Sequence, residues 1–250
     1  MRTKAIVIRK MQAGEYDQIV TLYSEDFGTM RAMARGVCKP TSVQSMHLEL
    51  LNLIEFEVIH GKSLPIISSA VMLNQHRSIK DSLQKLAGVS FFTEVLDKIA
   101  FENEKDSHLW DFLRTMLADF DSVDSDNVLP MFRKYQAEFL KVLGYAPQID
   151  RCVVCSKDVG DGPEKMIALS TELGGIMCPD CFLSGGRGIM LDKADLGLLT
   201  GAATPDSSNR GSLISKSGNR DRHSALDTFF EYTVGRKINS LSFFYQVLNA

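Results

Sequence analysis

Hydrophobic and polar positions alternate with a period of two along much of the first eighty residues, which is the pattern of half-buried β-strands. In residues 29–35, the odd-numbered positions carry two arginines, whereas the even-numbered positions carry only methionine and alanine. Turn signals such as Asp26-Phe27-Gly28 separate the segments. The expected strands are 4–9, 18–23, 29–35, 54–58 and 66–71. Five short strands of this kind predict a small β-barrel.

After residue 75 the apolar residues recur every three or four positions, which indicates amphipathic helices. Pro130 fits the first turn of one of them, and Gly144 with Pro147 ends it. The expected helices are 83–99, 109–117, 129–143, 192–199 with Asp192 as its cap, 226–234 and 241–247. Residues 201–224 are rich in Ser, Gly, Asn and Arg and are predicted to form a mobile loop. The chain is therefore predicted to be an α+β protein, a barrel followed by a helical bundle.

Four of the five cysteines form two Cys-x-x-Cys pairs inside residues 148–184, a segment that interrupts the bundle. The pairs are Cys152 with Cys155 and Cys178 with Cys181. Two-residue spacing lets both thiolates of a pair turn toward one ion, and two pairs complete a tetrahedral zinc site with Zn–S distances of about 2.3 Å. Because four protein ligands close the coordination, we expect one structural zinc ion with no catalytic role.

Three other interpretations of the cysteines stay open at this point: two disulfides, a thioredoxin-like redox pair, and thiols without a ligand. Two disulfides would need an oxidising compartment, whereas the sequence is typical of a cytosolic protein. A thioredoxin-like redox pair would need a βαβ setting, which neither pair has. Cys38 stands apart, and no paired His and carboxylate accompanies it, so we interpret it as incidental.

Charge is distributed unevenly over a chain whose net charge is −3. Residues 1–80 carry ten Lys and Arg against seven Asp and Glu. A basic groove on the barrel would follow a phosphate backbone, and its binding would weaken with salt. The bases expected to line that groove are Arg2, Lys4, Arg9, Lys10, Arg31, Arg35 and Lys39. Tyr16, Tyr23 and Phe27 would offer stacking surfaces, although Tyr23 also suits the core. The alternative is that these bases are ordinary solvated side chains.

Catalytic motifs are missing from the sequence. It contains no Gly-rich phosphate loop, no Gly-x-Ser-x-Gly and no His-Glu-x-x-His, and its five histidines are scattered singly. The pairs Glu55/Glu57 and Glu102/Glu104 resemble solvated faces. The sequence also has no apolar run of about eighteen residues that would span a membrane. We therefore expect a non-enzymatic cytoplasmic protein.

The most specific motifs are LGYAPQIDRCVVC at 143–155 and GGIMCPDC at 174–181. They are accompanied by AIVIR at 5–9, GEYD at 14–17, GTMRAMARG at 28–36 and GRKINS at 235–240. Together these segments resemble the bacterial recombination mediator family RecO over nearly the whole chain.

The resemblance implies an OB-fold barrel over 1–78 and a helical domain over 79–250 with its zinc-binding insert at 148–184. It implies DNA repair without covalent chemistry: binding of single- and double-stranded DNA, annealing of complementary strands, and recombinase loading with RecR onto DNA coated by single-strand-binding protein. The expected location is the cytoplasmic nucleoid. One departure is the weakly basic segment 36–42, where only Lys39 is charged, which predicts weaker or more salt-sensitive DNA binding. The alternative is a zinc-stabilised protein-interaction adaptor without direct DNA binding.

Overall fold

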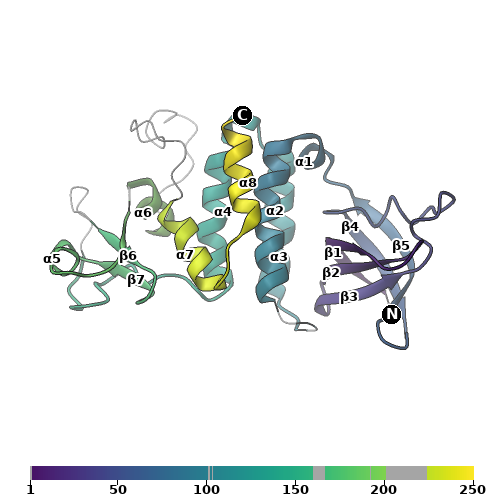
Figure 1. The fold of residues 1–250 in the computed structure, drawn as a ribbon, viewed down its shortest axis with the longest axis horizontal. Helices are drawn as coiled ribbons and strands as arrows, with labels where there is room; N and C mark the ends of the chain where they lie inside the picture. Colours follow the sequence, from purple (N-terminus) through teal and green to yellow (C-terminus); the bar gives the residue numbers. More distant parts are fainter. Residues whose placement is uncertain (1, 101, 103, 160–166, 192, 201–223) are drawn as a thin grey trace. The chain divides into compact units, whose positions relative to one another are not determined.

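The computed structural model describes residues 2–100, 102, 104–159, 167–191, 193–200 and 224–250 (Figure 1). The chain divides into two compact units, Met1–Val123 and Asp124–Ala250. The first unit contains the predicted barrel and three helices, and the second contains the remaining helices and the cysteine-rich segment.

The five predicted strands form a closed barrel in the order β1-β2-β3-β5-β4, which confirms the expected architecture. The pairing of β3 with β5 is parallel, and the other neighbours are antiparallel. The barrel encloses a core of small and branched apolar side chains from all five strands. The strands are β1 (Arg2–Gln12), β2 (Gln18–Ser24), β3 (Gly28–Ala34), β4 (Leu53–Ile59) and β5 (Ile66–Asn74).

A shift of register between Val7 and Arg9 changes which face of the barrel β1 presents. Ala5 and Val7 point into the core. Regular alternation would place Arg9 on the same inward side. The extra residue at this β-bulge reverses the alternation, so that Arg9 lies opposite Thr21 on the outer surface.

Three helices complete the first unit: α1 (Arg77–Asp81), α2 (Leu83–Ile99) and α3 (Ser107–Ser122). The Ser82 side chain accepts a hydrogen bond from the first turn of α2, and Asp106 accepts two from the first turn of α3. Phe92 of α2 packs edge-on against two aromatic rings of α3. Helix α2 also contacts β1, so its C-terminal end lies beside the barrel.

Glu104 and Lys105, which precede α3, lie against the β2–β3 turn. Gly28 in this turn has φ +62°, and a Cβ atom added to it would lie 1.9 Å from the carbonyl oxygen of Glu104. Asp26 accepts a hydrogen bond from the Thr3 hydroxyl at 2.6 Å and pairs with Lys105 at 3.3 Å. These two partners, Thr3 first, hold the pKa of Asp26 below its usual value. Close packing at Gly28 therefore places Glu104 next to the barrel.

The second unit combines helices with a small three-stranded sheet of order β7-β6-β8. Helices occur at each of the predicted positions in this unit, including α4 with Pro130 in its first turn. Asp192 and residues 201–223 of the predicted loop lie outside the described residues. The elements are η1 (Ser125–Asn127), α4 (Val128–Val142), β6 (Ala168–Ser170), β7 (Gly175–Met177), α5 (Pro179–Leu183), β8 (Ile189–Met190), α6 (Lys193–Thr200), α7 (Ala225–Val234) and α8 (Asn239–Leu248). Among the described residues, no helix combines the length and apolar character that crossing a membrane requires.

A buried carboxylate, Asp227, connects three helices of this unit. It accepts hydrogen bonds from the Gln136 amide of α4 at 2.7 Å and from the Tyr245 hydroxyl of α8 at 2.6 Å. It also forms a capping box with Ser224 at the start of α7. Burial and then the charge of Asp227 raise the pKa of Tyr245 far above its usual value. The Tyr245 hydroxyl therefore stays protonated and donates to the carboxylate.

Replacing Asp227 with alanine should destabilise the protein, because three buried donors lose their acceptor. We expect the free energy of unfolding in urea to fall by at least about 2 kcal/mol. Glu138→Ala is the matched control, because that carboxylate lies on α4, is 43% exposed and forms only a surface pair with Lys134. The control should cost about 0.5 kcal/mol or less. Equal losses for the two variants would contradict the stabilising role of Asp227.

Candidate nucleic-acid interface and metal centre

Two of the predicted bases lie in one row across the outer face of β1, β2 and β3. Arg9 is the register partner of Thr21, and Thr21 is the partner of Arg31. Since neighbouring strands are about 4.8 Å apart, the Cα atoms of the two arginines are roughly 10 Å apart. The bulge in β1 brings Arg9 into this row.

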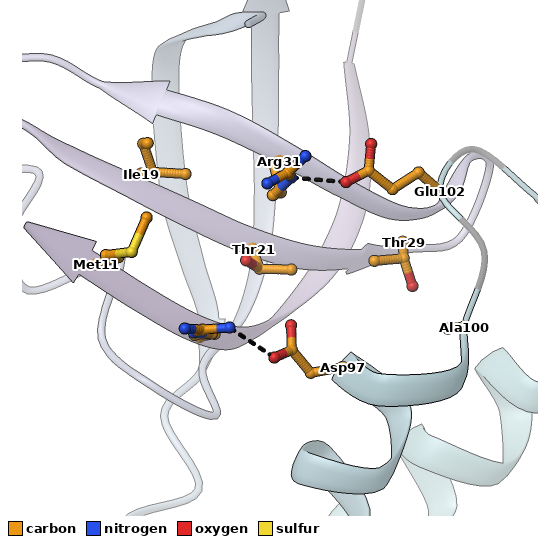
Figure 2. Close-up of a pocket in the computed structure, with 9 residues that line it drawn as sticks. Met11, Ile19, Thr21, Thr29, Arg31, Asp97, Ala100 and Glu102 are labelled. Atoms are coloured by element: carbon orange, nitrogen blue, oxygen red, sulfur yellow. Dashed lines mark hydrogen bonds and ion pairs between the residues drawn. The ribbon is translucent and has the colours of Figure 1, made fainter. Parts of the chain in front are cut away.

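The next row of the same face is apolar. Met11 is the partner of Ile19, and Ile19 is the partner of Met33. A cavity of about 360 Å³ is lined by the first row, by Met11 and Ile19 of the second row, and by Thr29, Asp97, Ala100 and Glu102. Figure 2 shows Met11, Ile19, Thr21 and Arg31 along the strands, with Asp97 and Glu102 on the opposite side. This volume lies in the lower part of the range of ligand-binding clefts, roughly 300–1,000 Å³.

Both arginines of the row are paired with carboxylates from outside the barrel. Arg9 pairs with Asp97 of α2 at 2.8 Å, and Arg31 pairs with Glu102, which follows α2, at 2.6 Å (Figure 2). The arginine side chains are 56% and 52% exposed. Ion pairs this exposed typically stabilise a fold by less than about 1 kcal/mol each. The guanidinium groups are therefore held in place, but only weakly.

Two further predicted bases extend this face toward one end of the barrel. Arg35 follows β3 on the outward side and is exposed, with no ion-pair partner within the described part of the chain. Lys39 lies over the ring of Tyr16, with its Nζ atom 5.8 Å from the ring centre. The Tyr16 ring is 41% exposed. The face thus has cationic groups at both ends and apolar side chains between them.

The remaining three predicted bases lie elsewhere on the barrel. Arg2 and Lys4 are on the part of β1 that pairs with β4, and Arg2 forms an ion pair with Glu55. Hydrogen bonding to Glu55 raises the pKa of Arg2. Lys10 points away from the row of Arg9 and pairs with Glu49 at 2.8 Å. The structure therefore brings together Arg9, Arg31, Arg35 and Lys39, but does not add these three to the same face.

Only one of the three candidate stacking aromatics is well exposed. Tyr23 is 1% exposed, and burial raises the pKa of its hydroxyl far above the usual value. Phe27 packs against the barrel core. Tyr23 is therefore a core residue, as its alternative interpretation held, and Tyr16 is the ring that solvent reaches.

Sequence reasoning missed the acidic partners of the arginine row. Glu102 was expected to be part of a solvated face, and nothing in the pattern singled out Asp97. It also missed Thr29, which lines the cavity at 5% exposure and whose hydroxyl has no hydrogen-bond partner among the described residues. An unsatisfied buried hydroxyl is uncommon in folded proteins. The helical spacing of residues 83–99 is the one feature of the sequence that could have helped to locate Asp97, because it places this residue near the end of the predicted helix.

The four cysteines of the two pairs converge in the second unit. Their sulfur atoms all lie within 4.8 Å of one another, and the Sγ atoms of Cys155 and Cys178 are 3.7 Å apart. A tetrahedron with metal–sulfur distances of about 2.3 Å has sulfur–sulfur edges of roughly 3.8 Å. A disulfide would need about 2.05 Å. The cluster therefore fits a shared metal ion, and its four sulfurs leave no ligand position open for catalysis.

Local backbone structure positions both cysteine pairs. Cys178 is the N-cap of α5 and Cys181 lies in its first turn, while the Cys178 amide donates to the Cys152 sulfur at 3.4 Å. The absence of a side chain at Gly175 lets β7 approach Gln148, because an added Cβ atom would lie 2.6 Å from the Gln148 carbonyl oxygen. The segment before Cys152 and the strand before Cys178 are thereby held side by side.

The pKa values of two thiols in the cluster are shifted in opposite directions. Burial raises the pKa of Cys152, but backbone amide donors, with Cys178 first, outweigh burial and lower it to about 6. Hydrogen bonding with the sulfurs of Cys155 and then Cys178 raises the pKa of Cys181 to about 12. Crowded sulfurs retain protons in this way until a cation compensates their charge.

Family comparison covers both units. The family described as "Recombination protein O N terminal" matches residues 1–76, and "Recombination protein O C terminal" matches residues 80–242. A protein named DNA repair protein RecO from Desulfatibacillum aliphaticivorans is 27% identical over 96% of this chain and 95% of its own length. A protein of the same name from Thermoanaerobacter sp. (strain X514) is 29% identical over 72% of this chain and 71% of its own length. The chain therefore belongs to the Recombination protein O, or RecO, family.

Proposed function

We propose that this chain is a non-enzymatic recombination mediator in DNA repair that binds DNA through the outer face of β1, β2 and β3. The observation that carries the proposal is the arrangement of that face, on which Arg9 and Arg31 flank Thr21 beside an apolar row. Arg35, Lys39 and Tyr16 extend the face at one end.

Such a face suits a flexible nucleic-acid strand. Guanidinium and ammonium groups bind phosphates without regard to sequence, and apolar and aromatic side chains offer surfaces to bases. Sequence-independent binding is what pairing of arbitrary complementary strands requires. A bound strand has part of its phosphate charge neutralised, so a second strand approaches with less repulsion. Annealing of single strands and binding of double-stranded DNA both follow from this neutralisation of phosphate charge, without a covalent step.

Family membership supports the further proposed partners. Relatives over nearly the whole chain are named DNA repair proteins. We infer that this chain works with RecR to load the recombinase onto DNA coated by single-strand-binding protein, at the nucleoid in the cytoplasm. Because segment 36–42 carries a single charge, that of Lys39, we infer that the bases on the strands contribute most of the binding.

For the metal centre we propose one zinc ion per chain, bound by Cys152, Cys155, Cys178 and Cys181. Four thiolates in a closed tetrahedral set are typical of structural zinc. The zinc would hold together the ribbon that contains β6 and β7, while the DNA-binding side chains lie in the other unit.

Reversing the charge of Arg31 and Arg35 together should weaken binding of a fluorescein-labelled single strand. We expect Arg31→Glu/Arg35→Glu to lose roughly tenfold or more in affinity at low salt, because two cationic contacts become repulsive. Fluorescence anisotropy across a salt series measures this loss. Arg77→Glu/Arg114→Glu is the control, because it changes the net charge equally on exposed helix positions.

Strand annealing tests the proposed function as a whole. The protein should speed annealing of complementary oligonucleotides at low salt, and the effect should decline as salt rises. A protein that neither binds nor anneals DNA at low salt would contradict the proposal. If such a protein still bound RecR, the adaptor interpretation would replace it.

Replacing two of the metal ligands should remove the ion and destabilise the second unit. Cys155→Ser/Cys178→Ser should lower the zinc content from about one ion per chain to near zero and lower the melting temperature, because metal binding and folding are coupled in such sites. Elemental analysis and thermal unfolding measure the two effects. Cys38→Ser, which changes an exposed cysteine outside the cluster, should leave both unchanged. A double variant that kept its zinc would show that these cysteines are not the ligands.

A further inference from the structure

The cavity beside the arginine row already contains the chemical competitors of a phosphate. Carboxylates of Asp97 and Glu102 face Arg9 and Arg31, the side chains best placed to bind a DNA backbone (Figure 2). A carboxylate and a phosphate oxygen bind a guanidinium through the same N–H donors. The two kinds of anion therefore cannot satisfy one arginine fully at the same time.

We propose that this cavity holds one backbone phosphate of a single strand between Arg9 and Arg31, and that Asp97 and Glu102 are internal competitors which the phosphate displaces. The inference rests on the proposed DNA-binding function and adds a regulatory property to it. The two acids lower the affinity of the free protein for DNA and make its binding less dependent on salt.

The exposure of these ion pairs favours displacement over permanent closure. All four side chains of the two ion pairs are partly exposed, with Asp97 the least so at 27% and Glu102 at 49%. Glu102 follows the end of α2, and Asp97 lies in the last turn of that helix. Each carboxylate can therefore return to water when its arginine turns to a phosphate. The Thr29 hydroxyl, which has no hydrogen-bond partner in the described part of the chain, gives the same cavity a spare polar group.

Displacement of the two carboxylates should change how strongly DNA binding depends on salt concentration. A cation that binds a phosphate normally releases counterions, which contributes about 0.7 per neutralised phosphate to the slope of log K against log salt for single strands. In this cavity the released carboxylates attract cations as the phosphate arrives. The two arginine contacts therefore contribute little to the salt slope of the native protein, although they contribute to binding.

The test compares full-length Asp97→Asn/Glu102→Gln with the native protein by anisotropy of a labelled oligothymidylate across a salt series. The variant should bind roughly three- to tenfold more tightly at low salt. Its salt slope should be steeper by about 0.7, the contribution of one neutralised phosphate, so the two affinities converge as salt rises. Asp81→Asn/Asp111→Asn is the matched control, because it removes two paired, exposed carboxylates elsewhere in the same unit.

Adding Arg9→Ala/Arg31→Ala to the neutralised variant should abolish the gain in affinity, and thermal unfolding checks that each variant is folded. If the native protein binds DNA but the neutralised variant matches the control in affinity and slope, the inference is overturned while the proposed function stands. If none of these proteins binds DNA at low salt, the proposed function fails and the inference with it. If the neutralised variant binds DNA and the native protein does not, the result would support the inference, because the two acids would then prevent binding altogether.

Discussion

The β-bulge between Val7 and Arg9 determines which side chains of the first strand reach the outer surface of the barrel. Closure of the barrel requires Ala5 and Val7 to fill its interior, and strict alternation would then direct Arg9 inward as well. One extra residue resolves the conflict. The bulge lets Ala5 and Val7 fill the core while Arg9 lies in line with Arg31 on the outer surface. The candidate binding face therefore depends on a local departure from regular strand geometry.

Net charge is a poor guide to the electrostatics of this barrel. Four of its seven early bases have carboxylate partners, and all four partners lie more than thirty residues away in sequence. The surplus of positive charge in the first eighty residues is thus partly neutralised within the fold. Within the described residues, Lys4, Arg35 and Lys39 have no ion-pair partner, and of these Arg35 and Lys39 lie together at one end of the strand face. The electrostatic field that a phosphate backbone would meet therefore depends more on the ion pairs of these Lys and Arg side chains than on their number.

Much of the fold could be predicted from sequence, because local periodicity determines it. The alternation over 29–35 predicted a strand with an arginine face, and the spacing of the cysteines predicted that their sulfurs converge. The partner of Arg31 could not be predicted. Glu102 is brought to it by packing between elements far apart in the chain, including the close approach at Gly28. Nor does a sequence pattern distinguish a bulged strand from a regular one. The sequence therefore does not show that Arg9 belongs to the strand face and Lys10 does not.

The carboxylate of Asp227 has a consequence for how the second unit assembles. Its charge is compensated only when the Gln136 amide, the Tyr245 hydroxyl and the amide of Ser224 are all in place. These groups come from α4, α8 and the start of α7, so none of these helices can detach without leaving a buried anion short of donors. We therefore expect α4, α7 and α8 to fold and unfold as one cooperative group, although Gln136 of α4 lies 91 positions before Asp227 of α7 in the chain.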